Sequence, residues 1–445
     1  MVDPHPAVLL LSCYELGHQP LSLASPLAFL ARAGIAAEAI DLGVDELDDN
    51  AVRRADFVAI SVPMHTALRL GLVVAQRVRK LNTRCQLGFF GHYATLNAAM
   101  LVAAGADIVL GGECDEALAS WAAGDAPTAG TAPPPYLDKL DYLVPLRDGL
   151  PELDRYLHLE RADGSRLAVG SVESSRGCRH LCRHCPLPPV YGGRFFVIPQ
   201  ASVLADIRQL VERGARHINF VDPDFLNGPR HALDVVRAMH LEHPEMTFDF
   251  TAKVEHLLKR RDDLAELGAS GCAFIVSAVE SLSNRVLEEL HKGHTAEEAR
   301  EALTLCRDAG IDLRPTFVAF TPWTTLDDYR ELFRWVIEED LVHQVDPIQL
   351  ALRLLVPPGT LLLDNPGLQP HLGALDSSGL TYRWTHPDPE MDRLQVRASA
   401  VVEAGAREGT THHDVLRALA ELVDLNVPPH VGHAKAPRLT EAWFC

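Results

Sequence analysis

Short apolar runs alternate with amphipathic helical patterns through the first 122 residues. The runs that predict buried strands fall at 8–11, 37–40, 57–62, 87–90 and 108–110. Between them, apolar residues recur with helical spacing at 22–33, 67–81, 96–104 and 116–122. Strands and helices that alternate in this way pack as a parallel sheet covered on both faces. Residues 1–122 are therefore predicted to form a doubly wound α/β domain, with ligands bound at the carboxyl ends of its strands.

The alternation returns after 123–137, a segment rich in Ala, Gly, Thr and Pro that indicates a linker. Within 138–364, strand patterns occur at 168–173, 217–221, 247–252, 272–278, 312–319 and 348–355. Helical patterns occur at 201–213, 229–240, 261–267, 283–290, 296–309 and 326–339. Six successive units predict a partial (β/α)6 TIM-like barrel, with its chemistry at the carboxyl ends of the strands. Residues 365–445 are predicted to form a small, mainly helical region.

The composition favours a small ligand over a nucleic acid. The formal net charge is −19 and no block of Lys and Arg occurs, whereas binding to phosphates needs a basic surface. No run approaches the roughly twenty apolar residues of a membrane span, and the first residues lack a signal-peptide pattern. Nine cysteines without a disulfide framework point to a reducing cytoplasm. We expect a cytoplasmic protein with a small-molecule or peptide-like substrate and no nucleic-acid or membrane partner.

Three cysteines in one short segment indicate the chemistry. Cys178, Cys182 and Cys185 follow the first barrel strand with C-x3-C-x2-C spacing. Three thiolates can hold three irons of a 4Fe–4S cluster and leave the fourth iron open to a ligand. A zinc site is the alternative, since His180 or His184 offers a fourth ligand. The motif resembles that of radical S-adenosylmethionine (SAM) enzymes, in which the open iron binds SAM and an electron from the cluster cleaves it to a 5′-deoxyadenosyl radical.

Other segments of the predicted barrel carry the same resemblance. Val-Glu-Ser at 279–281, Lys-Gly-His-Thr at 292–295 and Pro-Gly-Thr at 358–360 resemble family segments. The second strand ends in two carboxylates, for which helix capping is the alternative role. The resemblance implies an external electron donor of the flavodoxin or ferredoxin type. It also implies SAM contacts, which we expect from His184, Asp222, Asp224, Glu280, Ser281, Arg285 and Lys292.

Three of these positions carry a reservation. An ordinary solvated helix face is the alternative for Arg285 and Lys292. The sequence also departs from the family pattern twice. It has His184 where many members have an aromatic residue, and it lacks a Gly-Gly-Glu after the second strand.

A doubly wound domain ahead of such a barrel resembles the flavodoxin-like, cobalamin-binding domain of cobalamin-dependent radical SAM enzymes. The segment 19–26 is typical of that domain. The chain has no Asp-x-His-x-x-Gly, the motif that supplies a histidine to cobalt, so cobalamin would bind base-off without it. The alternative is a scaffold that packs against the barrel without a corrin. The expected corrin contacts are Gln19, Met64, His65, Thr66, Gly91, His92, Thr95, Gly112 and Glu113.

The last residues, 437–445, resemble the approach to the tail of a radical SAM subgroup named for Cys-Sec-Ala-Glu-Pro or Cys-Cys-Ala-Glu-Pro (CUAEP or CCAEP). On this resemblance Cys445 is the first residue of such a tail, and the natural chain continues beyond it. Cys445 is then a candidate catalytic thiol, as a soft ligand or redox group. The alternative is an ordinary terminus with an incidental thiol.

Together these features predict a radical SAM enzyme that transfers a methyl group from cobalamin to an unactivated carbon. One alternative is a cobalamin-independent radical SAM enzyme that forms a carbon–heteroatom bond, with the tail thiol as soft ligand. Another is an iron–sulfur sensor or binding protein without turnover.

Overall fold

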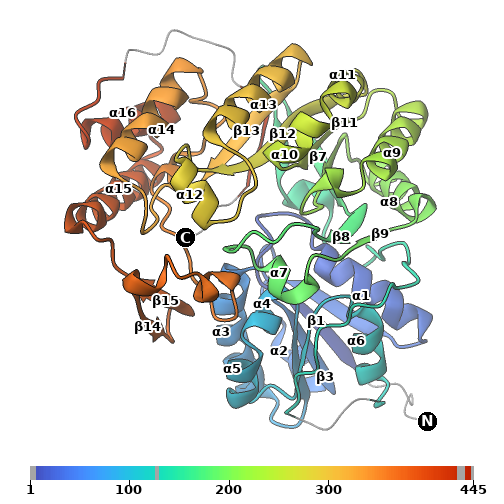
Figure 1. The fold of residues 1–445 in the computed structure, drawn as a ribbon. Coiled ribbons are helices and arrows are strands. Elements are labelled where there is room, and N and C mark those ends of the chain that lie inside the picture. The colour runs from blue at the N-terminus through green and yellow to red at the C-terminus, as the bar shows by residue number, and fades with distance from the viewer. Residues whose placement is uncertain (1–6, 126–129, 428–435, 442–445) are drawn as a thin grey trace, which may run out of the picture.

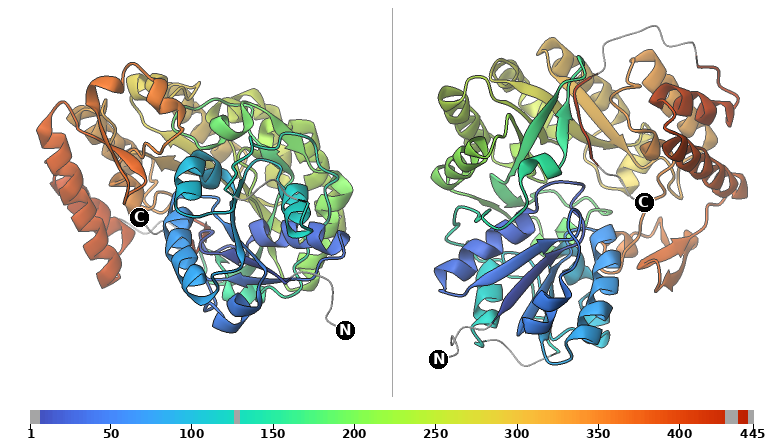
Figure 2. Two further views of the ribbon diagram at one scale, coloured as in Figure 1. Left: turned by 90° about the horizontal axis from the view of Figure 1, so that it is seen from below. Right: turned by 180° about the vertical axis from the view of Figure 1, so that it is seen from behind.

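The computed structural model describes residues 7–125, 130–427 and 436–441. A doubly wound front domain lies below a curled barrel sheet in Figure 1, and a C-terminal region flanks the barrel on the left. The views from below and behind in Figure 2 show the same three parts. Cys445 lies outside the described residues, so its role stays a prediction.

Five parallel strands form the front sheet, in the order β2-β1-β3-β4-β5. Successive side chains point to opposite faces, so Val8 and Leu10 pack on one side with α1 and α6, while Leu9 and Leu11 pack on the other. The predicted doubly wound domain is confirmed. Its strands are β1 (Val8–Ser12), β2 (Ala37–Asp41), β3 (Phe57–Ser61), β4 (Gln86–Phe90) and β5 (Ile108–Leu110). Its helices are α1 (Leu21–Arg32), α2 (Asp49–Arg54), α3 (His65–Leu81), α4 (His92–Leu96), α5 (Ala98–Ala103) and α6 (Asp115–Ala122).

The barrel sheet has the order β13-β12-β11-β10-β7-β6-β16. Its parallel strands are β7 (Arg166–Val172), β10 (His217–Phe220), β11 (Thr247–Thr251), β12 (Cys272–Glu280) and β13 (Asp312–Phe317). Two antiparallel strands extend it, β6 (His158–Glu160) and β16 (Arg438–Leu439). Helices follow the strands along the chain: α8 (Gln200–Glu212), α9 (Pro229–Glu242), α10 (Val254–Lys259), α11 (Arg261–Ala269), α12 (Asn284–Glu289), α13 (Ala296–Asp308) and α14 (Leu326–Glu338). The curled, partial parallel barrel is confirmed.

The sixth strand of the prediction is much reduced. Residues 347–350 form a 3-10 turn, and the following segment joins the barrel through one bridge between Phe320 and Arg353. Phe320 N donates to Leu352 O (2.9 Å) and Leu354 N donates to Phe320 O (2.8 Å). The apolar run is buried as predicted, but Pro347 starts a turn instead of a strand.

The C-terminal region packs against this sixth position. It holds the hairpin β14 (Leu372–Asp376) and β15 (Thr381–Trp384), then α15 (Pro389–Glu408) and α16 (His412–Glu421). The Asp388 carboxylate caps α15 by accepting from Glu390 N, and Gly409 ends this helix in the left-handed region at φ +67°. The chain then returns to the barrel, where β16 pairs with β6 beside the green strands in the right-hand view of Figure 2.

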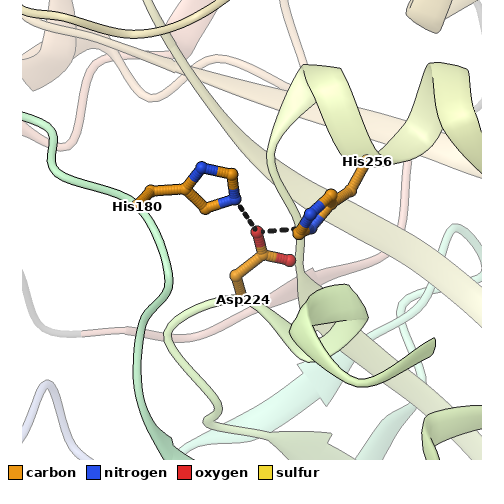
Figure 3. Close-up of side chains that lie close together, drawn as sticks. All are labelled: His180, Asp224 and His256. Carbon is orange, nitrogen blue, oxygen red and sulfur yellow. Dashed lines mark ion pairs between the residues drawn. The ribbon is translucent and has the colours of Figure 1, made fainter. Parts of the chain in front are cut away.

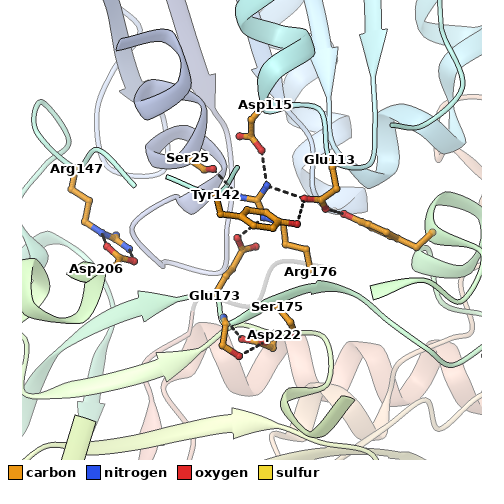
Figure 4. Close-up of polar contacts among 12 residues, drawn as sticks. Ser25, Glu113, Asp115, Tyr142, Arg147, Glu173, Ser175, Arg176, Asp206 and Asp222 are labelled. Carbon is orange, nitrogen blue, oxygen red and sulfur yellow. Dashed lines mark hydrogen bonds and ion pairs between the residues drawn. The ribbon is translucent and has the colours of Figure 1, made fainter. Parts of the chain in front are cut away.

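Two segments join the front domain to the barrel. Residues 130–136, the described end of the predicted linker, run beside β5, where Val109 N donates to Thr131 O (3.0 Å). The following segment carries Arg147, whose fully buried guanidinium donates to Asp206 on α8 (2.8 and 2.9 Å) and to Gln19 of the front domain (2.7 Å). Figure 4 shows the Arg147–Asp206 pair. One chain segment therefore fixes both domains against each other.

Candidate functional site

The three motif cysteines lie on one loop that follows β7. The short strands β8 (Ser175–Gly177) and β9 (Phe195–Val197) frame the loop, and helix α7 (Leu187–Tyr191) closes it. Cys178 and Cys182 are buried and Cys185 is half-buried, and none of the described cysteines forms a disulfide. Burial raises the pKa of Cys178, and it raises the pKa of Cys185 to about 12. Repulsion from the neighbouring cysteines adds to both shifts. The thiols of Cys178 and Cys185, which resist ionisation by themselves, suit a cationic iron cluster, because such a cluster stabilises thiolates.

A buried carboxylate fixes the start of this loop. Asp222, at the end of β10, accepts from Ser174 N (2.8 Å), Ser174 Oγ (2.8 Å) and Ser175 Oγ (2.6 Å). Burial raises the pKa of Asp222 to about 6, although these hydrogen bonds oppose the shift. Both oxygens of Asp222 are thus used to hold the cysteine loop, which the sequence did not reveal.

Glu280 stands at the end of β12 in a strained backbone conformation, with φ +66°. Its carboxylate lies 3.0 Å from His184 Nε2 and 3.2 Å from Lys292 Nζ. Burial opposes the charge, yet Lys292 and His184 hold the pKa of Glu280 well below its usual range. Glu280 also helps to raise the pKa of the buried Lys292, to which the thiols of the cysteine loop contribute. The structure therefore brings three of the predicted SAM contacts together beside the cysteine loop, where Glu280 is ionised and Lys292 is protonated.

The other predicted contacts of this segment are placed differently. Ser281 is buried, and its hydroxyl accepts from Ser283 N (3.1 Å) ahead of α12. Arg285 is exposed on α12. Of the two predicted cationic SAM contacts, Arg285 and Lys292, only Lys292 lies beside Glu280 and the cysteine loop.

Three further groups lie near the site that the sequence did not single out as ligand contacts, although one of them, His294, belongs to the Lys-Gly-His-Thr segment. Lys253 and His256 follow β11, and both come from the carboxyl end of a barrel strand, which is the one signal that pointed to them. His294 is buried with both ring nitrogens unpartnered, and burial together with Lys292 and Lys253 lowers its pKa to about 4. Asp224 does not stand alone after β10: its carboxylate lies between His180 and His256 (Figure 3).

The corrin contacts expected in the front domain fall into two groups. One group gathers at the carboxyl ends of β3 and β4, where α3 and α4 begin: Met64, His65, Thr66, Gly91, His92 and Thr95. Within it, burial lowers the pKa of His92 to about 4, and its Nδ1 has no hydrogen-bond partner. His65 Nε2 lies 2.8 Å from Gly379 O in the turn of the C-terminal hairpin.

The second group holds the domains together. Gln19 is held by Arg147. Gly112 has φ +72°, and Tyr136 O passes where its side chain would lie, 2.2 Å from an added Cβ. Glu113 accepts from the hydroxyls of Tyr142 (2.7 Å) and Tyr191 (2.9 Å). Both oxygens of Glu113 are therefore occupied by groups of the chain itself.

Figure 4 shows that Glu113 belongs to a buried network around Arg176. The Arg176 guanidinium lies 2.5 Å from Asp115, 2.9 Å from Glu173 and 3.6 Å from Glu113. Asp115 and Glu113 come from the front domain, whereas Arg176 and Glu173 precede the cysteines. The His92 and Tyr191 rings meet at the same boundary, with centroids 5.8 Å apart. The strand ends of the front sheet thus abut the cysteine loop directly.

A cavity of about 1480 Å³ lies between the start of α3 in the front domain, the reduced sixth position of the barrel and the C-terminal region. His65 and Thr66 line it from the front domain, and Leu352 lines it from the reduced sixth position. Apolar and small side chains of α15, among them Val402 and Ala406, form another wall. The cations and the acids that line it are Arg69, Arg161, Arg353, Arg417, Arg438, Glu160, Asp346, Glu403 and Glu441. The cavity suits a bulky ligand with both apolar and charged parts.

Among the described helices, none is both long and apolar enough to cross a membrane.

Comparison with known sequences places this site in context. The profile of the Radical SAM superfamily matches residues 172–336, from the end of β7 into α14. The chain is 25% identical to the hopanoid C-3 methylase of Methylococcus capsulatus in an alignment of 354 positions that covers 75% of this chain and 67% of that protein. It is also 25% identical over 211 residues to an uncharacterised methyltransferase of Pyrococcus horikoshii, covering 47% of this chain and 44% of the relative. The matched region thus spans less than half the length of some curated relatives.

Two solved structures share the fold. TsrM from Kitasatospora setae, a radical SAM methyltransferase solved with cobalamin and a [4Fe–4S] cluster, matches with a TM-score of 0.62 and 18% identity, over 76% of this chain and 73% of TsrM. OxsB, a cobalamin-dependent SAM radical enzyme solved with aqua-cobalamin, matches with a TM-score of 0.70 and 16% identity, over 90% of this chain and 67% of OxsB. The similarity confirms the predicted architecture of a doubly wound domain followed by a partial barrel.

Proposed function

We propose, from the premise that this chain belongs to the radical SAM superfamily through residues 172–336, that it is a cobalamin-dependent methyltransferase. When bound, the cluster and SAM supply a radical that removes hydrogen from an unactivated carbon, and cobalamin supplies the methyl group. The substrate is a small metabolite or a peptide-like molecule. An external donor of the flavodoxin or ferredoxin type supplies electrons, and the free thiols suit a reducing cytoplasm.

The contact between the front sheet and the cysteine loop carries this proposal. Methyl transfer requires a corrin on the front domain to face the radical site of the barrel. Tyr191, on the helix that closes the cysteine loop, donates to Glu113 and packs against His92. The two ligand-binding edges therefore share one boundary, which a sensor without turnover does not need.

The front domain also offers polar groups that suit a corrin or its side chains. Ser61 Oγ and His92 Nδ1 are buried without hydrogen-bond partners at the ends of β3 and β4. Buried polar groups are seldom left unpaired, so these atoms favour a polar ligand at this edge. The low pKa of His92 keeps its ring neutral at pH 7, which suits a buried hydrogen-bonding role. With no Asp-x-His-x-x-Gly in the sequence, we propose that the corrin binds base-off.

Glu280, Lys292 and His184 are the residues that we assign to SAM. The Lys292 ammonium is the cation for the SAM carboxylate, because it is buried beside the cysteine loop and stays protonated. Glu280 stays ionised and is available to the ribose hydroxyls or to the amine of SAM. His184 shares the Glu280 carboxylate and so orients it.

We place the substrate in the cavity beside α15. Ala406 lines this cavity, whereas Ala400, on the same helix, is exposed and does not line it. The variant A406W is expected to abolish substrate methylation while SAM cleavage without substrate continues at the wild-type rate. The variant A400W is the matched control and should keep both activities. Equal methylation by the two variants would place the substrate elsewhere.

The proposal is tested by anaerobic purification with iron, sulfide and hydroxocobalamin, followed by SAM and a strong reductant. We expect a cluster, a bound corrin and 5′-deoxyadenosine. The variant C182S should still bind the corrin, but it should lack the cluster and form no 5′-deoxyadenosine. Deoxyadenosine formation without corrin would instead favour a cobalamin-independent radical SAM enzyme. A cluster without SAM cleavage would leave a binding protein.

A further inference from the structure

Two histidines and an aspartate from three separate elements converge beside the cysteine loop. His180 lies within the loop, Asp224 follows β10, and His256 lies on α10 (Figure 3). Asp224 Oδ2 is 2.8 Å from His256 Nδ1 and 3.6 Å from His180 Nε2. One ligand atom from each side chain lies within 4.8 Å of the other two. No other group of this kind occurs among the described residues.

All three of these atoms are buried and lack a hydrogen-bond partner. The Asp224 carboxylate is 1% exposed and each histidine about 15%. Asp224 Oδ2 lies close to both rings, yet neither ring nitrogen makes a hydrogen bond to it of acceptable geometry. Three buried polar atoms without a hydrogen bond are costly. Ligand atoms that share a metal ion lie side by side in this way, because each points at the ion instead of at its neighbour.

The surrounding groups match what metal ligands need. Asp224 Oδ1 accepts from Leu226 N (3.1 Å), which fixes the carboxylate with Oδ2 facing the two histidine rings. His180 Nδ1 lies 3.7 Å from Glu255 Oε2. A carboxylate near one imidazole nitrogen favours the proton there and leaves the other nitrogen, Nε2 in His180, as a ligand.

We propose that His180, Asp224 and His256 bind one divalent transition-metal ion, separate from the iron–sulfur cluster. Two imidazoles and a carboxylate suit Mn²⁺, Fe²⁺ or Zn²⁺, and three protein ligands leave positions open to water. His180 lies two residues from both Cys178 and Cys182, so the ion fastens the cysteine loop to the ends of β10 and α10. In this assignment Asp224 binds a metal ion instead of SAM, for which the sequence suggested it.

The test uses the full-length, tag-free protein with its cluster loaded and oxidised. That cluster state is diamagnetic, so added Mn²⁺ can be counted by the electron paramagnetic resonance signal of the free ion. We expect one Mn²⁺ per chain, displaced by Zn²⁺. The variants D224N and H256Q are expected to weaken binding at least about tenfold.

The variant H240Q is the matched control, because His240 on α9 also has an unpartnered buried nitrogen but does not belong to the trio. It should bind Mn²⁺ like the wild type. Iron and sulfide content of each variant checks that the protein is folded, and a rise in wild-type melting temperature with Mn²⁺ that H256Q lacks provides a second measurement. No bound Mn²⁺, or equal binding by wild type, D224N and H256Q, would overturn the proposal.

Discussion

The buried guanidinium of Arg147 allows a quantitative test of how the domains are joined. Its four hydrogen bonds run to both oxygens of Asp206, to Gln19 Oε1 and to Ser171 O, all between 2.7 and 2.9 Å. The side chains of Arg147 and Asp206 are 0% and 3% exposed. The variant R147M keeps much of the side-chain volume but leaves a buried carboxylate with Gln209 as its remaining side-chain donor (2.6 Å).

The magnitude follows from burial. Removing one partner of a buried ion pair costs about 3–5 kcal/mol, because the other charge stays out of water. The acceptors on Gln19 and Ser171 also lose their donor, which places R147M at the upper end of this range. The double variant R147M/D206L removes both charges, and an apolar pair of similar volume is often close to neutral. We expect it to recover most of the lost stability.

Equilibrium urea unfolding followed by circular dichroism measures these differences. A matched control lies on α8, the helix that carries Asp206. Arg208 makes an equally bidentate pair with Glu242 (2.7 and 2.7 Å), but these side chains are 49% and 33% exposed. Solvent screening should make R208M far less damaging than R147M. If the two single variants lose the same stability, or if R147M/D206L is as unstable as R147M, burial is not the reason for the effect.

Three further predictions concern single residues. Burial and neighbouring carboxylates raise the pKa of Glu15 to about 8, so the folded state holds a proton that the unfolded state releases above about pH 4.5. The free energy of unfolding should therefore fall as pH rises from about 5 to 8, by at most about 1.4 kcal/mol per pH unit. If urea unfolding of E15Q shows the same pH dependence as wild type, the prediction is wrong. D222N weakens the anchor of the cysteine loop, so iron and sulfide per chain should fall at least about twofold after reconstitution, while the exposed control D262N should match wild type. G112A places a Cβ 2.2 Å from Tyr136 O at φ +72°, and should cost about 2–4 kcal/mol in urea unfolding; unchanged stability would mean that the segment beside β5 can move away.

Local patterns predicted the strands and the cysteine loop well, because both features depend on residues that are adjacent in the sequence. The apolar run at 57–62 became β3 (Phe57–Ser61), since a buried parallel strand needs apolar residues on both faces. The apolar run at 348–355 was wrongly predicted to be a strand, because an apolar pattern indicates burial but does not distinguish a strand from an irregular buried segment. There, Pro347 and one bridge to Phe320 decided the structure.

Contacts between distant segments escaped the sequence. Glu113 follows a strand of the front sheet, and this position suggested a ligand contact. The hydroxyls that occupy its oxygens belong to Tyr142 and Tyr191, far along the chain. His180 and His256 likewise meet at Asp224 with no spacing pattern that connects them. Such constellations depend on how the barrel curls, which short-range periodicity does not encode.

The pairing of β16 with β6 has a consequence for biogenesis. His158 and Thr440, bonded across this pair, are separated by 282 residues. At a synthesis rate of about 5–20 residues per second, the ribosome needs roughly 14–56 s between making the two strands. During that interval β6 is an open sheet edge on a nascent protein that already has its front domain, and open edges invite pairing with other chains. The yield of folded protein should therefore depend on chaperone supply and growth temperature during expression as much as on the supply of iron.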